Sequence, residues 1–312
     1  MIRVAAFAVA LIFLILTLIL FPTISVAGDL GLCLPSPNQW LLPRFPGWLL
    51  NALLIFLSAS LIDSANKKYN FVQEGDPLVA IVLLLLLCLN CISTATLSTS
   101  SLLLFCNVLC LYIIFSTYEE TNATREFFLI ATFPAIGAMT QYAFLVMIPV
   151  YIAGGLMMKS FRIRELIAFI FGLLAPYWIA MGLGIVSPLQ FRLPDSLAVF
   201  NAASVENDIF ISLLAVGAMS VIGIILALYN GVKLFTRNSR LRCMHTTFNI
   251  MGFVSVLAVI FDFNNFVAYT GTIALWVAVE TATLLSLYRL RQPGVALGIL
   301  LLIFLPLYIL AL

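Results

Sequence analysis

Apolar runs long enough to cross a lipid bilayer follow one another along the whole chain. The first of them reads VAAFAVALIFLILTLILF, from Val4 to Phe21. A helix needs about 20 residues, at roughly 1.5 Å each, to cross the hydrocarbon core. Of the 312 residues, 63% are hydrophobic and only 9% are charged, whereas soluble domains carry about 25% charged residues. Such a chain cannot cover a water-facing surface, so we predict an all-α, polytopic transmembrane bundle forming one domain, 1–312.

One segment, Phe127–Met158, is too long for one crossing and short for two. Pro134, Gly137, Thr140 and Gln141 lie in its middle, where a turn is expected. We predict a hairpin of two short helices here, either two full spans or a re-entrant pair, which gives about eleven spans in total. The predicted spans are 4–21, 47–63, 77–92, 101–115, 127–138, 140–158, 165–186, 209–231, 245–263, 267–288 and 294–312.

The basic residues predict the orientation. With the hairpin in place, all but two of the 15 Lys and Arg residues fall on one side, and only Arg44 and Arg192 face the other. A single crossing would put the basic loops on its two sides on opposite faces. Because cytoplasmic loops carry the excess of Lys and Arg, we predict a cytoplasmic N-terminus and an outer C-terminus.

The first span has features of a signal peptide as well. Arg3 precedes it, and Ser25-Val26-Ala27 offers a small-residue cleavage site. The apolar run of 18 residues exceeds the usual signal-peptide core of about 7–15 residues. An uncleaved first helix is therefore favoured, with cleavage left open.

Glu280 is the clearest ionisable residue inside a predicted span. It lies eight residues before Tyr288, at the cytoplasmic end of its helix, so it is about 12 Å deep. Such a group is a candidate proton or cation relay, or a hydrogen-bonding partner for a buried polar substrate group. A neutral Glu bonded to a neighbouring helix is the favoured alternative, because the sequence shows no obvious basic partner. His245, a lone His near the inner surface, is expected to be structural or interfacial.

The sequence predicts no metal site and no cofactor. Cys88, Cys91, Cys106 and Cys110 lie inside apolar runs, where free Cys behaves as a small hydrophobic residue. Phosphate-binding loops, zinc-protease motifs and serine-hydrolase elbows are missing. The few basic residues lie in short loops, so no nucleic-acid partner is predicted.

Three residues on the predicted outer face are candidates for chemistry on a lipid. Asp29 lies at the start of the longest outer loop and could serve as a general base. Arg192, with Arg44 as the second outer cation, could hold a lipid phosphate. An ordinary solvated acid is the more common situation for a residue such as Asp29.

The run from Arg162 through GLLAPYW opens with Arg164-Glu165 and carries Gly-x-x-x-Pro-Tyr from Gly172. It resembles an uncharacterised family of bacterial inner-membrane proteins, a domain of unknown function. That resemblance implies a polytopic fold in a bacterial cytoplasmic membrane and no particular activity. A first helix followed by an outer loop with an early acid, Asp29, is similar to the GT-C glycosyltransferases, which use polyprenyl-phosphate sugars. Members of that superfamily usually have more spans or a soluble domain, and many have paired acids in the first loop, unlike this chain.

Three functions remain open from the sequence. The leading hypothesis is a protein that binds or acts on a lipid-linked glycan, a polyprenyl-phosphate glycan, at the outer face, with Asp29 as catalytic residue and Arg192 and Arg44 as binding residues. The alternative is a transporter or binding protein with a path between helices near Glu280. The third is a structural subunit of a membrane complex. Membrane lipids are the only other partners predicted.

Overall fold

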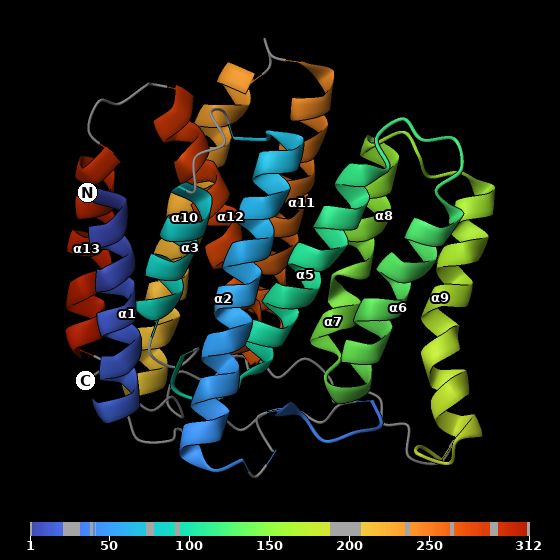
Figure 1. The fold of residues 1–312 in the computed structure, drawn as a ribbon, viewed down its shortest axis with the longest axis horizontal. Coiled ribbons are helices and arrows are strands. Elements are labelled where there is room, and N and C mark those ends of the chain that lie inside the picture. Colours follow the sequence, from blue (N-terminus) through green and yellow to red (C-terminus); the bar gives the residue numbers. More distant parts are fainter. Residues whose placement is uncertain are drawn as a thin grey trace.

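The computed structural model describes residues 2–20, 32–37, 40, 42–72, 78–90, 94–187, 207–234, 238–262, 265–287 and 293–310. The regular structure in these ranges is helical throughout (Figure 1). The helices are α1 (Ile2–Leu20), α2 (Arg44–Tyr69), α3 (Leu78–Cys88), α5 (Thr99–Ser116), α6 (Thr124–Thr140), α7 (Ala143–Val146), α8 (Ile148–Met157), α9 (Ile163–Gly182), α10 (Asn207–Leu234), α11 (Ser239–Phe261), α12 (Phe266–Leu287) and α13 (Pro293–Leu310).

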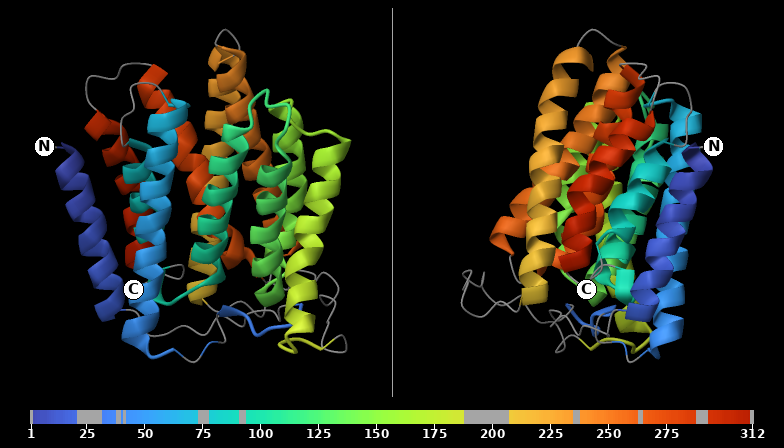
Figure 2. Two further views of the ribbon diagram at one scale, coloured as in Figure 1. Left: turned by 45° about the vertical axis from the view of Figure 1, so that its right-hand side comes forward. Right: turned by 90° about the vertical axis from the view of Figure 1, so that its left-hand side faces the viewer.

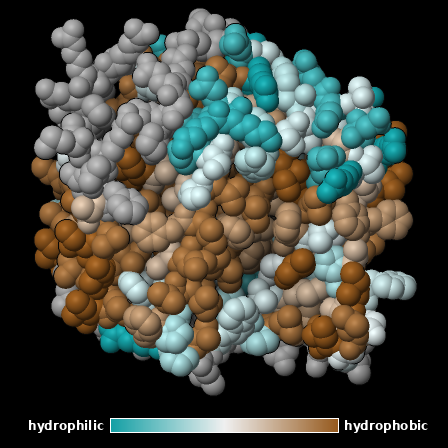
Figure 3. All heavy atoms as spheres, in the orientation of Figure 1, coloured by the Kyte–Doolittle hydropathy of each residue, from teal (hydrophilic) through white to brown (hydrophobic). Residues whose placement is uncertain are grey.

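The all-α prediction is confirmed, and six of the described helices are long and apolar enough to cross a membrane. They are α2, α5, α9, α10, α11 and α12. Shorter apolar helical stretches lie in α1, α3, α7–α8 and α13. Apolar residues form a belt across the middle of the molecule, with hydrophilic residues gathered above it (Figure 3). The chain is therefore a multipass α-helical membrane protein.

The core is built around α12, which packs against α3, α5, α10 and α11. Its small residues let these neighbours approach closely. A Cβ added at Gly271, for example, would lie 2.8 Å from the backbone oxygen of Ser100 in α5. Helix α3 is also buried on every side, because α1, α2 and α12 enclose it, and an all-round apolar sequence is what such a position requires.

A helical hairpin occupies the segment whose crossing number the sequence left open. Helix α6 continues through Pro134 to Thr140, the chain turns at Gln141, and α7 and α8 run back beside α6 (Figures 1 and 2). The antiparallel pairing is visible in side-chain contacts at both ends, since Gly137 faces Phe144 and Gly155 faces Phe127. The turn therefore falls at the polar Gln141.

Helix α9 lies against α6 along most of its length and runs in the same direction. The two backbones approach closely at Gly172, because a Cβ there would collide with the carbonyl group of Phe128. The hydroxyl of Thr132 in α6 also donates a hydrogen bond to the Gly172 oxygen, at 3.3 Å. Helix α9, which carries Arg164-Glu165 and the Gly-x-x-x-Pro-Tyr run from Gly172, is thus an outer helix that contacts the bundle mainly through α6.

Candidate functional site: a buried Glu–His–Asn cluster

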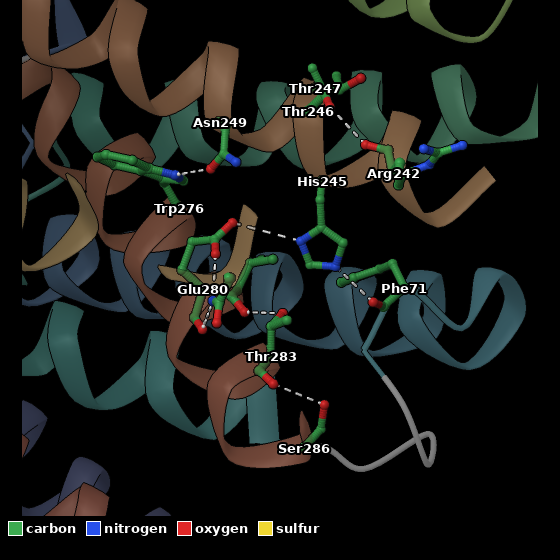
Figure 4. Close-up of polar contacts among 12 residues, drawn as sticks. Phe71, Arg242, His245, Thr246, Thr247, Asn249, Trp276, Glu280, Thr283 and Ser286 are labelled. Atoms are coloured by element: carbon green, nitrogen blue, oxygen red, sulfur yellow. Dashed lines mark hydrogen bonds and ion pairs between the residues drawn. The ribbon is translucent and has the colours of Figure 1, made fainter. Parts of the chain in front are cut away.

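Three buried polar residues from three consecutive long helices meet at one end of the bundle. Asn230 lies near the end of α10, His245 near the start of α11 and Glu280 near the end of α12. Antiparallel helices bring these positions to the same depth. Their exposed fractions are 0%, 2% and 0%, so the cluster is shielded from the surroundings. Figure 4 shows how Glu280 and His245 face each other.

The carboxylate of Glu280 is held from two sides. The Asn230 amide nitrogen donates to Glu280 Oε2 at 2.6 Å and to the Glu280 backbone oxygen at 2.8 Å. On the other side, His245 Nδ1 lies 3.6 Å from Glu280 Oε1. The second ring nitrogen, His245 Nε2, lies 2.9 Å from the backbone oxygen of Phe71, just after α2.

These contacts assign the protons of the cluster. A carbonyl oxygen only accepts hydrogen bonds, so His245 Nε2 must carry a hydrogen. Nδ1 then faces Glu280 Oε1, and a neutral imidazole beside an ionised carboxylate would place two acceptors opposite each other. One additional proton, on either atom, removes this conflict and leaves the pair neutral overall, whereas an unpaired buried charge is strongly disfavoured. His245 is therefore the basic partner of Glu280 that the sequence did not reveal.

The cluster has hydrogen-bonding capacity that no described residue uses. Asn230 Oδ1, Glu280 Oε1, His245 Nδ1 and the nearby Thr281 Oγ1 are buried without a hydrogen-bond partner in the described part of the chain. Buried polar atoms in native proteins are almost always satisfied. Several such atoms around one carboxylate indicate a place that accepts a proton, a water or a polar group of a ligand.

A lateral groove of about 590 Å³ lies between α10 and α11, next to this cluster. Its lining residues are Ala227, Leu228, Gly231, Val232, Asn249 and Phe253. Gly231 directly follows Asn230, and Asn249 is one helical turn beyond His245 and accepts a hydrogen bond from Trp276 Nε1 at 2.8 Å. Leu228 and Val232 are 65% and 75% exposed, so the groove opens sideways, toward the lipid. The groove is open at Gly231 of α10, where a side chain is missing. A Cβ added there would have no neighbouring atom within 4 Å.

The other predicted site residues are Asp29, Arg192 and Arg44. Asp29 and Arg192 lie outside the described residues. Arg44 starts α2 and donates a hydrogen bond from Nη2 to the backbone oxygen of Leu18 in α1, at 2.6 Å. Phe71, which contacts His245, follows the opposite end of α2, so Arg44 and Glu280 lie at opposite ends of the bundle.

Two other polar groups, one partly buried and one fully buried, have hydrogen-bond partners within the protein. Asp262 accepts hydrogen bonds from Asn265 and Tyr269, at 2.9 and 3.1 Å, and so closes the short connection between α11 and α12. The hydroxyl of Tyr151 bonds to Asn107, which donates to Thr272 at 2.9 Å. Among the described residues, no group of three or more potential metal ligands is found.

No protein-family model, no curated protein and no solved structure matches the chain. The functional interpretation therefore depends on the geometry alone. That geometry provides the Glu280–His245 pair, which can hold a proton, the Asn230 amide that positions it and the apolar α10–α11 groove nearby. The described cluster contains no Ser or Cys nucleophile next to a base.

Sequence reasoning found Glu280, but it expected His245 to be structural or interfacial and did not connect Asn230 with either residue. Depth was the signal that could have joined them. In the structure all three lie one to two turns from the ends of α10, α11 and α12, and antiparallel neighbours place equal depths side by side. The predicted limits at 231 and 245 put Asn230 and His245 at the membrane surface and so hid this signal.

Proposed function

We propose that this protein binds a neutral amphiphile of the bilayer in the groove between α10 and α11, with the Glu280–His245 pair as the polar, proton-holding group on a path from the groove into the bundle. The observation that carries the proposal is a buried carboxylate with an unused acceptor atom, whose neighbours Asn230 and His245 lie one residue and one helical turn from residues that line a lateral apolar groove. A hydrocarbon chain matches the groove walls, and the amide of Asn249 offers the hydrogen bonds that a polar end requires.

The cluster explains why the bound molecule should be neutral. With one proton on either Glu280 or His245 the pair carries no net charge, so an anion would leave its charge unpaired there. A hydroxyl of the ligand can instead donate to Glu280 Oε1. Reaching that atom requires the helices to separate, because Glu280 is 0% exposed and does not line the groove.

Photolabelling tests the groove. The probe is a monoacylglycerol with a diazirine on its acyl chain, added to the protein in lipid nanodiscs, and the labelled peptides are mapped by mass spectrometry. We expect enrichment in 227–232 and 249–253. Gly231→Leu should abolish it, because the new side chain fills the groove without meeting a neighbour. Gly217→Leu is the matched control on the same helix, at an exposed glycine outside the groove with nothing within 4 Å.

A second variant separates the cluster from the groove. Glu280→Gln keeps the shape, and its amide can donate to His245 Nδ1, but the free acceptor and the exchangeable acid proton are lost. We expect weaker labelling in this variant with unchanged thermal stability. Labelling that is uniform over all lipid-facing helices, or identical in Gly231→Leu and Gly217→Leu, would show that the groove is not a binding site.

We also propose the orientation predicted from the charges, with about eleven crossings and a cytoplasmic N-terminus in a bacterial inner membrane. Basic residues from separate segments gather at one end of the bundle. Lys68 lies 3.4 Å from the Tyr112 hydroxyl, Arg240 lies over the Tyr69 ring, and Lys159 pairs with Glu119 at 3.1 Å. That end carries the Glu280 cluster and is the expected cytoplasmic end.

The hypothesis of a lipid-linked glycan substrate also remains a proposal, and it depends on residues other than the Glu280 cluster. A polyprenyl chain is one apolar chain that the groove could hold, but catalysis was assigned to Asp29, with Arg192, at the other membrane face. Replacement of Asp29 by Asn and of Arg192 by Ala, assayed by complementation of a deletion strain, tests that hypothesis, because full function in both variants contradicts it.

A further inference from the structure

A second groove, of about 570 Å³, lies on the far side of the bundle from α10, between the N-terminal halves of α6 and α9. It is lined by Thr124, Arg125, Phe128, Arg164, Ile167, Ala168 and Phe171. The proposed binding of a neutral amphiphile does not involve any of these residues. A ligand of this second groove has to match both its walls and its mouth.

The walls are apolar and face outward. Phe128, Ile167 and Phe171 are 36%, 51% and 63% exposed. They lie on the two helices below the mouth, within stretches that are otherwise apolar. A hydrocarbon chain is the natural partner of such walls in a bilayer.

The mouth is cationic. Arg125 and Arg164 lie in the first turns of α6 and α9, and both are exposed. Arg164 Nη1 donates to the side-chain oxygen of Asn122 at 3.2 Å. Within the described residues, neither guanidinium forms an ion pair with a carboxylate. The neighbouring Glu165 is buried, 1% exposed, and does not line the groove.

Two further features favour an anion at this mouth. Because α6 and α9 are parallel, both helix N-termini lie there, and neither has a side-chain cap, so their dipoles and free N–H groups attract negative charge. The hydroxyl of Thr124 also lines the groove, and its oxygen is buried without a hydrogen-bond partner. These donors supplement the two guanidinium groups, which suit phosphate oxygens.

We propose that the α6–α9 groove binds an anionic glycerophospholipid. Its phosphate lies between Arg125 and Arg164 and accepts a hydrogen bond from the Thr124 hydroxyl. One acyl chain lies along Phe128, Ile167 and Phe171. A zwitterionic lipid places a second, positive group against the two guanidinium groups, and a free phosphate ion leaves the apolar walls without a partner.

Native mass spectrometry of the full-length protein in a non-ionic detergent tests the site. Phosphatidylglycerol, phosphatidylcholine and inorganic phosphate are titrated separately. The test variant is Arg125→Gln with Arg164→Gln. Its control, Lys159→Gln with Arg162→Gln, removes the same number of charges from exposed positions near the same helix end that do not line the groove.

We expect the wild-type protein to bind phosphatidylglycerol more tightly than phosphatidylcholine and to ignore inorganic phosphate. The test variant should lose affinity for phosphatidylglycerol by about 25-fold, a factor of about five for each basic residue near an anionic headgroup, while the control keeps most of it. Phe171→Ala, which removes part of the wall, should weaken binding about threefold, and Leu174→Ala, exposed on the same helix outside the groove, should not.

Three outcomes overturn the proposal: no headgroup preference in the wild-type protein, equal losses in the test and control variants, or phosphate binding as tight as lipid binding. Equal losses would show a diffuse basic surface in place of a site. None of these results bears on the α10–α11 groove, because the two grooves share no residue. Far-UV circular dichroism of each variant identifies any that fails to fold.

Discussion

The substitution Gly252→Ala tests the packing that holds α10 and α11 against the central helix. Trp276 of α12 is fully buried between Gly252 of α11 and Gly223 of α10. A Cβ at Gly223 would lie 2.6 Å from Trp276 Cζ3, and one at Gly252 would overlap the middle of the indole ring even more closely. Carbon atoms in contact normally lie about 3.5–4.0 Å apart, so neither position accepts a methyl group unless the ring moves.

The expected cost follows from what the ring would lose. Overpacking in a close-packed core costs about 1–3 kcal/mol. A displaced ring also gives up the hydrogen bond from Trp276 Nε1 to Asn249 Oδ1, at 2.8 Å, and interhelical hydrogen bonds in membrane proteins contribute about 0.6–1.7 kcal/mol. We therefore expect Gly252→Ala to lower the free energy of unfolding by about 2–4 kcal/mol.

Equilibrium unfolding in mixed micelles, followed by far-UV circular dichroism while the fraction of denaturing detergent is raised, measures this change. Gly217→Ala in α10 is the matched control, because nothing lies within 4 Å of the added Cβ. It should be neutral or stabilise by up to about 1 kcal/mol, since Ala is the better helix former. A double-mutant cycle with Trp276→Leu removes the ring and should make Gly252→Ala nearly silent.

The interaction energy between Gly252→Ala and Trp276→Leu tests the packing argument directly. We expect an interaction energy of about 2 kcal/mol or more between Gly252→Ala and Trp276→Leu, as for residues in direct contact. If Gly252→Ala is as stable as Gly217→Ala, or if its cost persists in the Trp276→Leu background, then the indole ring does not fill the space between the two glycines and the packing argument is wrong.

Three further predictions concern orientation, the ionisation of a thiol and a buried hydrogen bond. In intact cells, a membrane-impermeant maleimide should label a variant that retains only Cys33 and spare one that retains only Cys243, and the reverse pattern would invert the proposed topology. Burial raises the pKa of the Cys33 thiol, so less thiolate is present near neutral pH, and its labelling rate should rise steeply from about pH 8 to about pH 10. Tyr151→Phe should lower the free energy of unfolding by about 1 kcal/mol, because the bond to Asn107 is lost, and an unchanged value in mixed micelles would show that this hydroxyl does not contribute.

The helices were predictable because the bilayer imposes their length, but their ends were less so. Helix α2 starts at Arg44 and continues to Tyr69, past the predicted span 47–63, because a polar helix can extend into water beyond the hydrocarbon core. Helix α3 ends at Cys88, before the predicted limit of 92. There the Asn51 side chain donates to the backbone oxygen of Thr94, at 3.2 Å, and so ties Thr94 to α2.

The candidate site was only partly predictable for a physical reason. A buried acid is conspicuous in an apolar run, whereas its partners are common residues that gain meaning only when neighbours are known. Hydropathy gives the depth of His245 and Asn230 but does not say which helices touch. The sequence could not predict the grooves for the same reason. Each groove is formed by side chains from two helices and by the space that small residues leave between them.

Directional contacts explain how helices with little amphipathic pattern find one register. Lipid tails are as apolar as the helix surfaces, so hydrophobicity alone does not select neighbours in a membrane. Helix α12 instead carries a polar side chain every fourth residue, at Thr272, Trp276 and Glu280, and these bond to α5, to α11 and to α10, respectively. A shift of α12 by one turn would break all three bonds and push the Trp276 ring away from its glycines. The same register places Glu280 behind the α10–α11 groove, so the contacts that specify the fold also position the proposed site.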